Sequence, residues 1–326
     1  MLNIKTPYRV SLVGGGTDFK EWYNYNDGGV ISFSIDKFVH IILRELPKTY
    51  KYNYRIRYVQ NEEVNNKNKI KHKVIRELLN KEKINSRLDI TYIGEFPARS
   101  GLGSSSAFTV GLINGIYSLC KKKNLNKKDL STKAMYFEQN VLKEKVGSQD
   151  QIIASYGGLN KIIFKKNNFV CKKIILDKVI EKKITDSLFL VWTGLSRNAE
   201  KIETKKFSNF SDKKVILTST FELVNETENC LKNKNNIIKN LGKILNEQWR
   251  LKKSIDPIVS NDKIDEIYQS AVNAGASGGK LLGAGAGGFF LFLVEEDRQK
   301  NFLNKMKKYF IQSVKISYDG SKIIQI

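Results

Sequence analysis

The chain has 326 residues, of which 41% are hydrophobic and 27% are charged. This composition is typical of a soluble globular protein, and the length allows one large or two medium domains. The longest purely apolar run, residues 289–294, is far shorter than the roughly 20 residues that a membrane helix needs, so we expect no membrane partner. The N-terminus lacks the apolar stretch of a secretory signal, and we therefore expect a cytoplasmic protein.

The net charge of +23 is strongly basic, and such a charge is a reason to consider nucleic-acid binding. The lysines, however, are interleaved with asparagines in polar stretches such as residues 65–73 and 232–240, which is typical of a solvated surface. No zinc-finger or RNA-recognition signature accompanies them, so we expect no nucleic-acid partner. Three widely spaced cysteines and two histidines argue against a disulfide framework and a structural zinc site.

The first half of the chain predicts strands interrupted by helices. Apolar residues at helical spacing predict helices over residues 67–83 and 108–119, and residues 130–145 predict a third helix. The segment GSQDQIIASYGG that follows predicts a polar loop and a short helix. Stretches rich in β-branched and aromatic residues predict strands at 9–13, 30–35, 39–43, 54–59 and 88–93.

The second half predicts a hairpin, a helical region and a final mixed segment. The hairpin joins residues 161–164 to 169–175, and residues 212–251 are mainly helical in pattern. Further strands are predicted at 187–193, 289–294 and 313–318, and further helices at 264–272 and 298–310.

Three glycine-rich strings occur in the order PYRVSLVGGGTD (7–18), PARSGLGSSSAF (97–108) and KLLGAGAGGFF (280–290). Together they resemble the motifs of the GHMP small-molecule kinases. The resemblance implies an α+β fold with two domains. These are an N-terminal domain similar to a small-subunit ribosomal protein, over residues 1–180, and a ferredoxin-like C-terminal domain, over residues 181–326. It implies ATP and Mg²⁺ as cofactors, and it leaves a homodimer open.

The central string has the chemistry of a phosphate-binding loop. Glycines let backbone N–H groups point at an anion, and the helix that follows adds the positive end of its dipole. A serine N-cap after a tight turn is the alternative. The resemblance implies that Ser105 supplies a hydroxyl to Mg²⁺ and that the ATP phosphates are surrounded by Gly101, Leu102, Gly103, Ser104, Ser105 and Ser106.

The resemblance also implies the catalytic and metal-binding residues. Glu138 is expected to bind Mg²⁺, with an exposed helix carboxylate as the alternative and Glu144 as the nearest competitor. Asp150, in the loop GSQDQ, is expected to accept the proton of the acceptor hydroxyl. Arg9 is expected to face Asp150 and to stabilise the developing alkoxide, unless it is a surface arginine at a sheet edge.

The first and third strings are expected to bind the acceptor. Asp18 matches the aspartate with which sugar kinases bind ring hydroxyls, and the triple glycine before it departs from galactokinase. With its triple glycine, the chain resembles the branch that includes the D-glycero-D-manno-heptose 7-phosphate kinases of bacterial surface-polysaccharide synthesis. Arg197, with Lys201, is a candidate for the acceptor's phosphate, and a solvated helix start is the alternative. The other expected acceptor residues are Gly15, Gly16, Thr17, Gly285 and Gly287. For the third string, a glycine turn that permits close backbone packing is the alternative.

These features predict an ATP-dependent sugar kinase that phosphorylates the anomeric hydroxyl of heptose 7-phosphate. Another sugar 1-kinase, similar to fucokinase or galactokinase, is the alternative within the same enzyme class. A non-catalytic ligand sensor of the same fold is the alternative from a different class.

Overall fold

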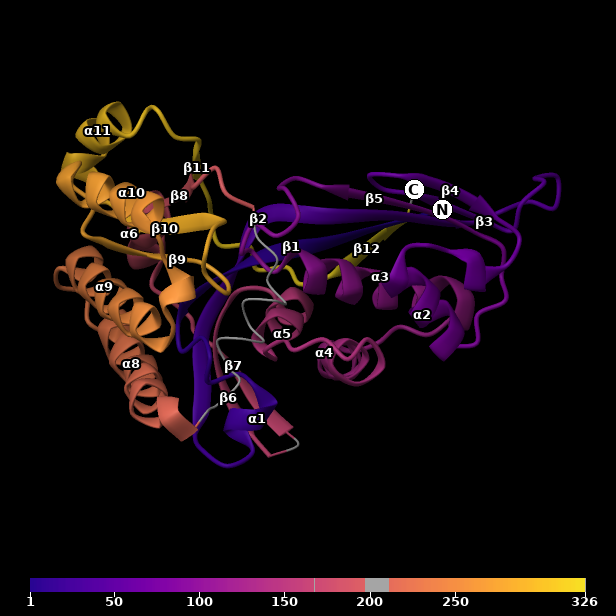
Figure 1. Ribbon diagram of the computed structural model, residues 1–326, viewed down its shortest axis with the longest axis horizontal. Helices are drawn as coiled ribbons and strands as arrows, with labels where there is room; N and C mark the ends of the chain where they lie inside the picture. Colours follow the sequence, from indigo (N-terminus) through magenta and orange to yellow (C-terminus); the bar gives the residue numbers. More distant parts are fainter. Residues whose placement is uncertain (167, 197–210, 326) are drawn as a thin grey trace.

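The computed structural model describes residues 1–166, 168–196 and 211–325, so Arg197 and Lys201 lie outside the described residues. It has a larger sheet at one end and a smaller sheet with most of the C-terminal helices at the other (Figure 1). The strands of the larger sheet are β1 (Leu2–Val13), β2 (Gly28–Glu45), β3 (Tyr54–Arg57), β4 (Asn61–Val64), β5 (Leu88–Gly94), β6 (Leu159–Lys165), β7 (Asn168–Lys173) and β12 (Lys322–Gln325).

The larger sheet has the strand order β12-β1-β2-β5-β3-β4, and β2 also pairs with β6, which pairs with β7. The smaller sheet is antiparallel, with the order β11-β8-β10-β9. Its strands are β8 (Leu188–Trp192), β9 (Gly278–Leu281), β10 (Phe289–Leu293) and β11 (Ile311–Ser313). The α+β architecture predicted from the sequence is therefore confirmed.

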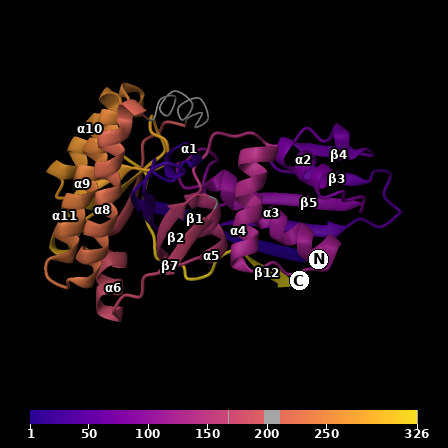
Figure 2. The same cartoon turned by 90° about the horizontal axis from the view of Figure 1, so that it is seen from below.

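The helices of the first half are α1 (Lys20–Tyr23), α2 (Lys73–Lys81), α3 (Ser104–Lys121), α4 (Lys127–Tyr136) and α5 (Gln149–Tyr156). Those of the second half are α6 (Lys178–Asp186), α8 (Lys214–Lys232), α9 (Ile237–Ile255), α10 (Asp262–Asn273) and α11 (Glu296–Lys305). Helices α3 and α5 pack on β1 and β2, and α4 packs on both helices. Helices α8 to α11 lie together at the other end (Figure 2).

Strand β2 is the spine of the larger sheet. Its first part, from Gly28 to Phe33, pairs with β6, and its second part, from Val39 to Glu45, pairs with β5. The sequence predicts two strands here, but the structure has one strand of 18 residues. Asp36 and Lys37, the polar pair that separates the two predicted strands, stay in extended conformation within it.

Helix α3 lies close to the sheet because glycines face β1 and β2. A Cβ atom at Gly111 would lie 2.7 Å from the hydroxyl oxygen of Thr6, and one at Gly115 would lie 2.7 Å from Ile4 Cδ1. Glycine therefore permits a spacing that any side chain would enlarge. This close packing holds the middle of α3, the helix that begins with the serine string, against β1.

The end of the chain departs most from the sequence prediction. The strand predicted at 313–318 is wrong beyond its first residue, because β11 covers Ile311–Ser313 and the segment that follows forms only an isolated bridge between Ile316 and Ile35. Ser317 donates its backbone N–H to the carbonyl of Ser34 at 2.9 Å, and the last strand, β12, pairs with β1. The predicted division at residue 180 falls within α6, and β12 belongs to the first sheet, so this division stays a proposal.

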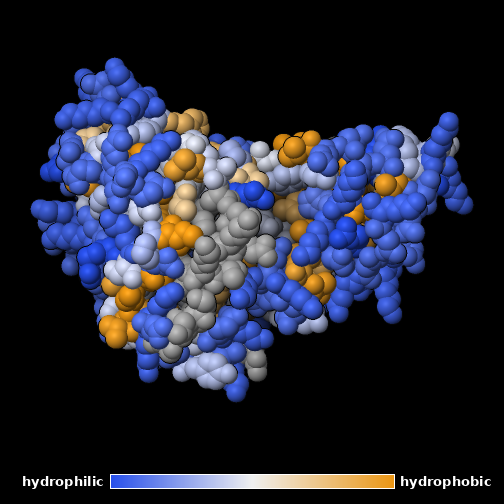
Figure 3. Space-filling model, in the orientation of Figure 1, coloured by the Kyte–Doolittle hydropathy of each residue, from blue (hydrophilic) through white to orange (hydrophobic). Residues whose placement is uncertain are grey.

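The face of the molecule shown in Figure 3 is mainly hydrophilic, in keeping with the 56 lysines and arginines of the sequence. Among the described residues, no helix combines the length and the apolar character that crossing a membrane requires.

Candidate active site

A cleft lies between β1 and α5 on one side and α9 and β9 on the other. All three glycine strings contribute to its wall. Gly15 and Gly16 come from the first string, Gly101 and Gly103 from the second, and Gly283 from the third. Segments that are more than 260 residues apart in the sequence therefore meet at one site.

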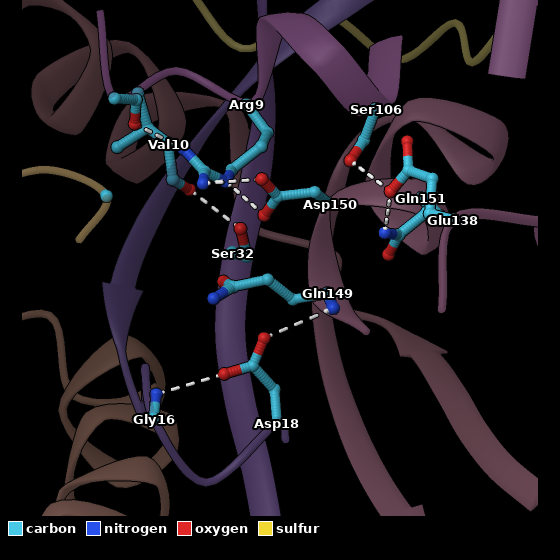
Figure 4. Close-up of polar contacts among 12 residues, drawn as sticks. Arg9, Val10, Gly16, Asp18, Ser32, Ser106, Glu138, Gln149, Asp150 and Gln151 are labelled. Carbon is cyan, nitrogen blue, oxygen red and sulfur yellow. Dashed lines mark hydrogen bonds and ion pairs between the residues drawn. The ribbon is translucent and has the colours of Figure 1, made fainter. Parts of the chain in front are cut away.

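Arg9 and Asp150 form an ion pair in this cleft (Figure 4). Arg9 Nε donates to Asp150 Oδ1 at 2.6 Å, and Arg9 Nη2 donates to Oδ2 at 2.7 Å. Such two-pronged pairs fix geometry as well as charge. Asp150 lies in the first turn of α5 and not in the predicted loop, so the positive end of the helix dipole also favours its negative charge. Its side chain keeps 21% of its surface exposed, so a ligand can reach it.

Arg9 also ties β1 to the second glycine string. Its backbone N–H donates to the carbonyl of Leu102 at 3.0 Å, and its Nη1 donates to the carbonyl of Gly101. Gly103 has a φ of +72°, and a Cβ atom there would lie 3.1 Å from Asp150 Oδ2. Glycine thus allows the loop to approach the carboxylate. The side chain of Leu102 is buried in the core, so only its backbone belongs to this arrangement.

The serine string begins helix α3. The N-cap residue is Gly103, which has no side chain to cap the helix, so the alternative of a serine N-cap is wrong. Ser104 and Ser105 line the cleft, and Ser105 is exposed. The free N–H groups at the start of an 18-residue helix, together with these hydroxyls, suit a phosphate group.

Glu138 lies behind the serine string in a π-helical turn, η2 (Phe137–Val141). Its side chain is fully buried, Ser106 Oγ donates to its Oε2 at 2.9 Å, and Gln151 also donates to Oε2 (Figure 4). Its other oxygen, Oε1, has no hydrogen-bond partner. Burial raises the pKa of Glu138 to about 7, and the charge of Glu144 adds to this increase.

This arrangement fits a magnesium site, because a buried carboxylate oxygen without a partner lies beside the serine string. The hydroxyl that contacts Glu138 belongs to Ser106, whereas the sequence favours Ser105. The predicted alternative of an exposed carboxylate is wrong for Glu138, which is 1% exposed. A π-helical turn is a local feature often found at functional sites, and no pattern in the sequence predicts it.

Asp18, from the first glycine string, also lines the cleft and is 2% exposed. Its Oδ1 accepts from the N–H of Gly16 at 2.9 Å, and its Oδ2 accepts from the N–H of Gln149 at 3.3 Å (Figure 4). Burial raises the pKa of Asp18, against the lowering effect of the Gly16 hydrogen bond. Thr17 is not part of the wall, because its buried hydroxyl contacts the carbonyls of Gly14 and Gly29.

The third glycine string reaches the cleft at a different place from the one predicted. Gly283 and Ala284 line it, whereas Gly285 and Gly287 pack elsewhere. A Cβ atom at Gly285 would lie 2.9 Å from Val259 Cα, and one at Gly287 would lie 2.7 Å from the carbonyl oxygen of Leu195. The interpretation of these two glycines as close-packing positions is therefore favoured over contact with the acceptor.

Two buried lysines, which the sequence analysis did not identify, also line the cleft. Lys280 Nζ donates to the carbonyl of Leu12 at 2.9 Å, and Lys252 Nζ donates to that of Leu281 at 2.6 Å. Lys280 could have been selected from the sequence as a site residue, because it is the first residue of the third glycine string. Lys252 carries no comparable signal, because its position on the inner face of α9 depends on tertiary packing.

Comparison with known proteins agrees with this geometry. The family model for the N-terminal domain of GHMP kinases matches residues 68–158, and that for the C-terminal domain matches residues 231–312, together more than half of the chain. The chain is a GHMP kinase. The D-glycero-alpha-D-manno-heptose 7-phosphate kinase of Campylobacter jejuni is 28% identical to it, over 98% of each chain.

Solved structures share the fold of this GHMP kinase. A D-glycero-D-manno-heptose 1-phosphate kinase from Bacteroides thetaiotaomicron superposes with a TM-score of 0.80 at 20% identity, over 100% of this chain and 99% of that one. The galactokinase of Lactococcus lactis gives a TM-score of 0.75 at 16% identity, over 98% and 95% of the two chains. As a GHMP kinase, the protein is an ATP-dependent phosphotransferase that acts on an alcohol group.

Proposed function

We propose that this GHMP kinase transfers the γ-phosphoryl group of ATP to the anomeric hydroxyl of D-glycero-D-manno-heptose 7-phosphate. The product is the 1,7-bisphosphate. The observation that carries the proposal is the position of the Arg9–Asp150 pair, which lines one cleft with the serine string and with Asp18. The full-length similarity to the Campylobacter jejuni enzyme supports the choice of acceptor.

In the proposed reaction, Asp150 accepts the proton of the anomeric hydroxyl while that oxygen bonds to the γ-phosphorus. The bond between the γ-phosphorus and its bridging oxygen breaks, and ADP leaves with the electron pair. Arg9 orients Asp150 and stabilises the negative charge that develops in the transition state. Glu138, Ser105 and Ser106 would hold Mg²⁺, which when bound neutralises charge on the phosphates.

The charges of the cleft support an acceptor that carries a phosphate. Its described lining contains the cations Arg9, Arg99, Lys252 and Lys280 and two carboxylates, those of Asp18 and Asp150. Lys280 contacts Leu12, near the first glycine string, and Lys252 contacts Leu281, at the start of the third. We therefore propose that these lysines bind the phosphate of the acceptor. The role predicted for Arg197 stays a prediction outside the described residues.

Release of ADP across a panel of acceptors tests the proposal. The panel contains heptose 7-phosphate, free heptose, galactose and fucose. Two charge-assisted hydrogen bonds to the phosphate should favour heptose 7-phosphate over free heptose by about 10² to 10⁴ in kcat/KM. Equal efficiency with any unphosphorylated sugar would overturn the substrate assignment and leave the kinase assignment in place.

A further inference from the structure

Two polar groups at the acceptor end of the cleft are buried without a hydrogen-bond partner. They are the hydroxyl oxygen of Ser11 and the side-chain carbonyl oxygen of Gln149, in residues that are 4% and 8% exposed. Both residues line the cleft. Within the part of the chain that the structure describes, no other buried side-chain atom that lacks a partner belongs to a cleft-lining residue.

The side chains of these two residues border the same space beside Gly15, near the Arg9–Asp150 pair. A Cβ atom built on Gly15 would lie 3.8 Å from both Ser11 Oγ and Gln149 Nε2. Ser11 follows Arg9 by two residues on β1, so the two side chains share a face of the strand. Gln149 precedes Asp150, and its backbone N–H donates to Asp18, so its side chain lies between the two carboxylates (Figure 4).

An unpaired buried polar group is unfavourable, and most such groups in native proteins are satisfied. Groups that line a ligand cleft can be satisfied by the ligand instead. A hydroxyl and an amide can each both donate and accept hydrogen bonds, which suits neutral hydroxyl groups. The carboxyl oxygens of Asp18 beside them can accept further hydrogen bonds. The set therefore matches adjacent hydroxyls on a sugar ring.

We infer that Ser11 and Gln149 bind two ring hydroxyls of the acceptor and determine which sugars are phosphorylated. This inference rests on the proposed function, because it assumes a sugar in the cleft. It adds two residues that discriminate between sugars by their hydroxyl pattern, apart from the lysines that bind the phosphate. A site built to hydrogen-bond a hydroxyl disfavours an analogue that lacks it, because the buried groups then stay unpaired.

The test combines variants with acceptors from which one hydroxyl is removed. Ser11→Ala and Gln149→Met remove the polar groups at small or equal volume. The acceptors are heptose 7-phosphate and its monodeoxy forms, each with one ring hydroxyl replaced by hydrogen. Thr220→Val is the matched control, because the hydroxyl of Thr220 is also buried without a partner but lies outside the cleft lining. Thermal unfolding of each variant confirms that it folds.

With the unmodified enzyme, we expect two of the monodeoxy acceptors to have a kcat/KM about 10- to 100-fold below that of the parent acceptor. One of them lacks the hydroxyl that Ser11 binds, and the other lacks the hydroxyl that Gln149 binds. Gln149→Met should lower kcat/KM with the parent acceptor by a similar factor. When the partner hydroxyl is also removed from the acceptor, kcat/KM of Gln149→Met should fall by less than about a further 3-fold. Ser11→Ala should behave in the same way with a different deoxy form. The KM for ATP should change less than about 2-fold, and Thr220→Val should keep the unmodified pattern.

The inference is overturned if both variants keep the unmodified ratio between the parent acceptor and every deoxy form. If the unmodified enzyme prefers another sugar, the deoxy forms of that sugar are used, so the substrate proposal can fail while this inference stands. If the unmodified enzyme phosphorylates no sugar of the panel, the proposed function fails first and this inference falls with it.

Discussion

The acidic residues of the cleft region have different environments, and these match different tasks. Asp150 is held by Arg9 at the exposed start of a helix, where it can meet an acceptor hydroxyl. Glu138 is buried beneath the serine string, and burial raises its pKa to about 7. Neighbouring carboxyl groups that lie in different environments are typical of sites in which such groups have distinct acid, base and metal-binding roles.

The raised pKa of Glu138 predicts a pH-dependent magnesium requirement. Mg²⁺ binds the ionised carboxylate and competes with its proton, so half-saturating Mg²⁺ should increase about tenfold when the pH falls from 8 to 6. Titration of Mg²⁺ in the kinase assay at several pH values measures this shift. In Glu138→Gln, the requirement should be higher at every pH and should lose this dependence. An unchanged Mg²⁺ titration in Glu138→Gln would refute the metal role.

The same group predicts how stability changes with pH. The folded protein binds the Glu138 proton more tightly than the unfolded chain, because the pKa rises from 4.5 to about 7 on folding. The contribution of this group to stability is therefore full below about pH 4.5 and is lost as the pH rises to about 7. Denaturant unfolding should show that Glu138→Gln gains more stability relative to the unmodified protein at pH 8 than at pH 5. A gain of equal size at both pH values would contradict the assignment.

Arg99 gives a stability prediction that does not depend on the substrate. Its backbone has a φ of +63°, in the left-handed region, and its exposed side chain lines the cleft. Arg99→Gly and Arg99→Ala remove the same charge, but alanine keeps the Cβ that disfavours this conformation. We expect the glycine variant to be more stable by about 1 kcal/mol, measured by denaturant unfolding. An alanine variant of equal or higher stability would contradict this prediction.

At the residue scale, the sequence identified the groups that lie within motifs. Arg9, Asp150 and Asp18 were found because glycine strings or a family pattern surround them. Gln149 and Lys252 were assigned no role, because their importance depends on which side chains lie opposite after folding. The contact between Ser106 and Glu138 was missed for the same reason, since helical phase alone does not select one serine of three.

At the scale of elements, alternation and helical spacing predicted most strands and helices but not their joins. The predicted strands at 30–35 and 39–43 form one strand, because β1 pairs with β2 on both sides of Asp36. The helix predicted at 130–145 is α4 followed by the π-helical turn that holds Glu138. A π-helical turn differs from an α-helix by a shift of one residue in its backbone hydrogen bonds. The spacing of apolar residues does not reveal this shift.

The segment between β11 and β12 fastens the helix that carries Asp150. Ser321 donates its backbone N–H to the carbonyl of Ala154 at 2.7 Å, and a Cβ atom at Gly320 would lie 2.1 Å from the carbonyl oxygen of Ser155. Both acceptors belong to α5. The end of the chain thus contacts the helix whose first turn carries Asp150, the proposed catalytic carboxylate.

This contact predicts the effect of adding one methyl group. Gly320→Ala should destabilise the fold by about 1 to 3 kcal/mol in denaturant unfolding and lower kcat, because α5 and the segment must separate. Lys322→Ala is the control, since it removes an ion pair with Asp319 in which both side chains are exposed, and should change stability by less than about 1 kcal/mol. Equal stability of Gly320→Ala and the unmodified protein would contradict this close contact.

At the scale of the molecule, the chain closes on itself. Leu2 pairs with Gln325, so the two ends of the described chain lie side by side (Figure 1). The sequence could not predict this return, because β12 is short and its pattern shows no partner. The fold family followed from the glycine strings, and the cytoplasmic location and the homodimer stay predictions.

The central claim is that Asp150 promotes phosphoryl transfer to a sugar phosphate in this cleft. Steady-state ADP formation with heptose 7-phosphate, compared between the unmodified protein and Asp150→Asn, tests it most directly. We expect Asp150→Asn to lose about 10² to 10⁴ in kcat while the KM for ATP changes less than about 3-fold. Turnover by Asp150→Asn within about 3-fold of the unmodified protein would contradict the claim.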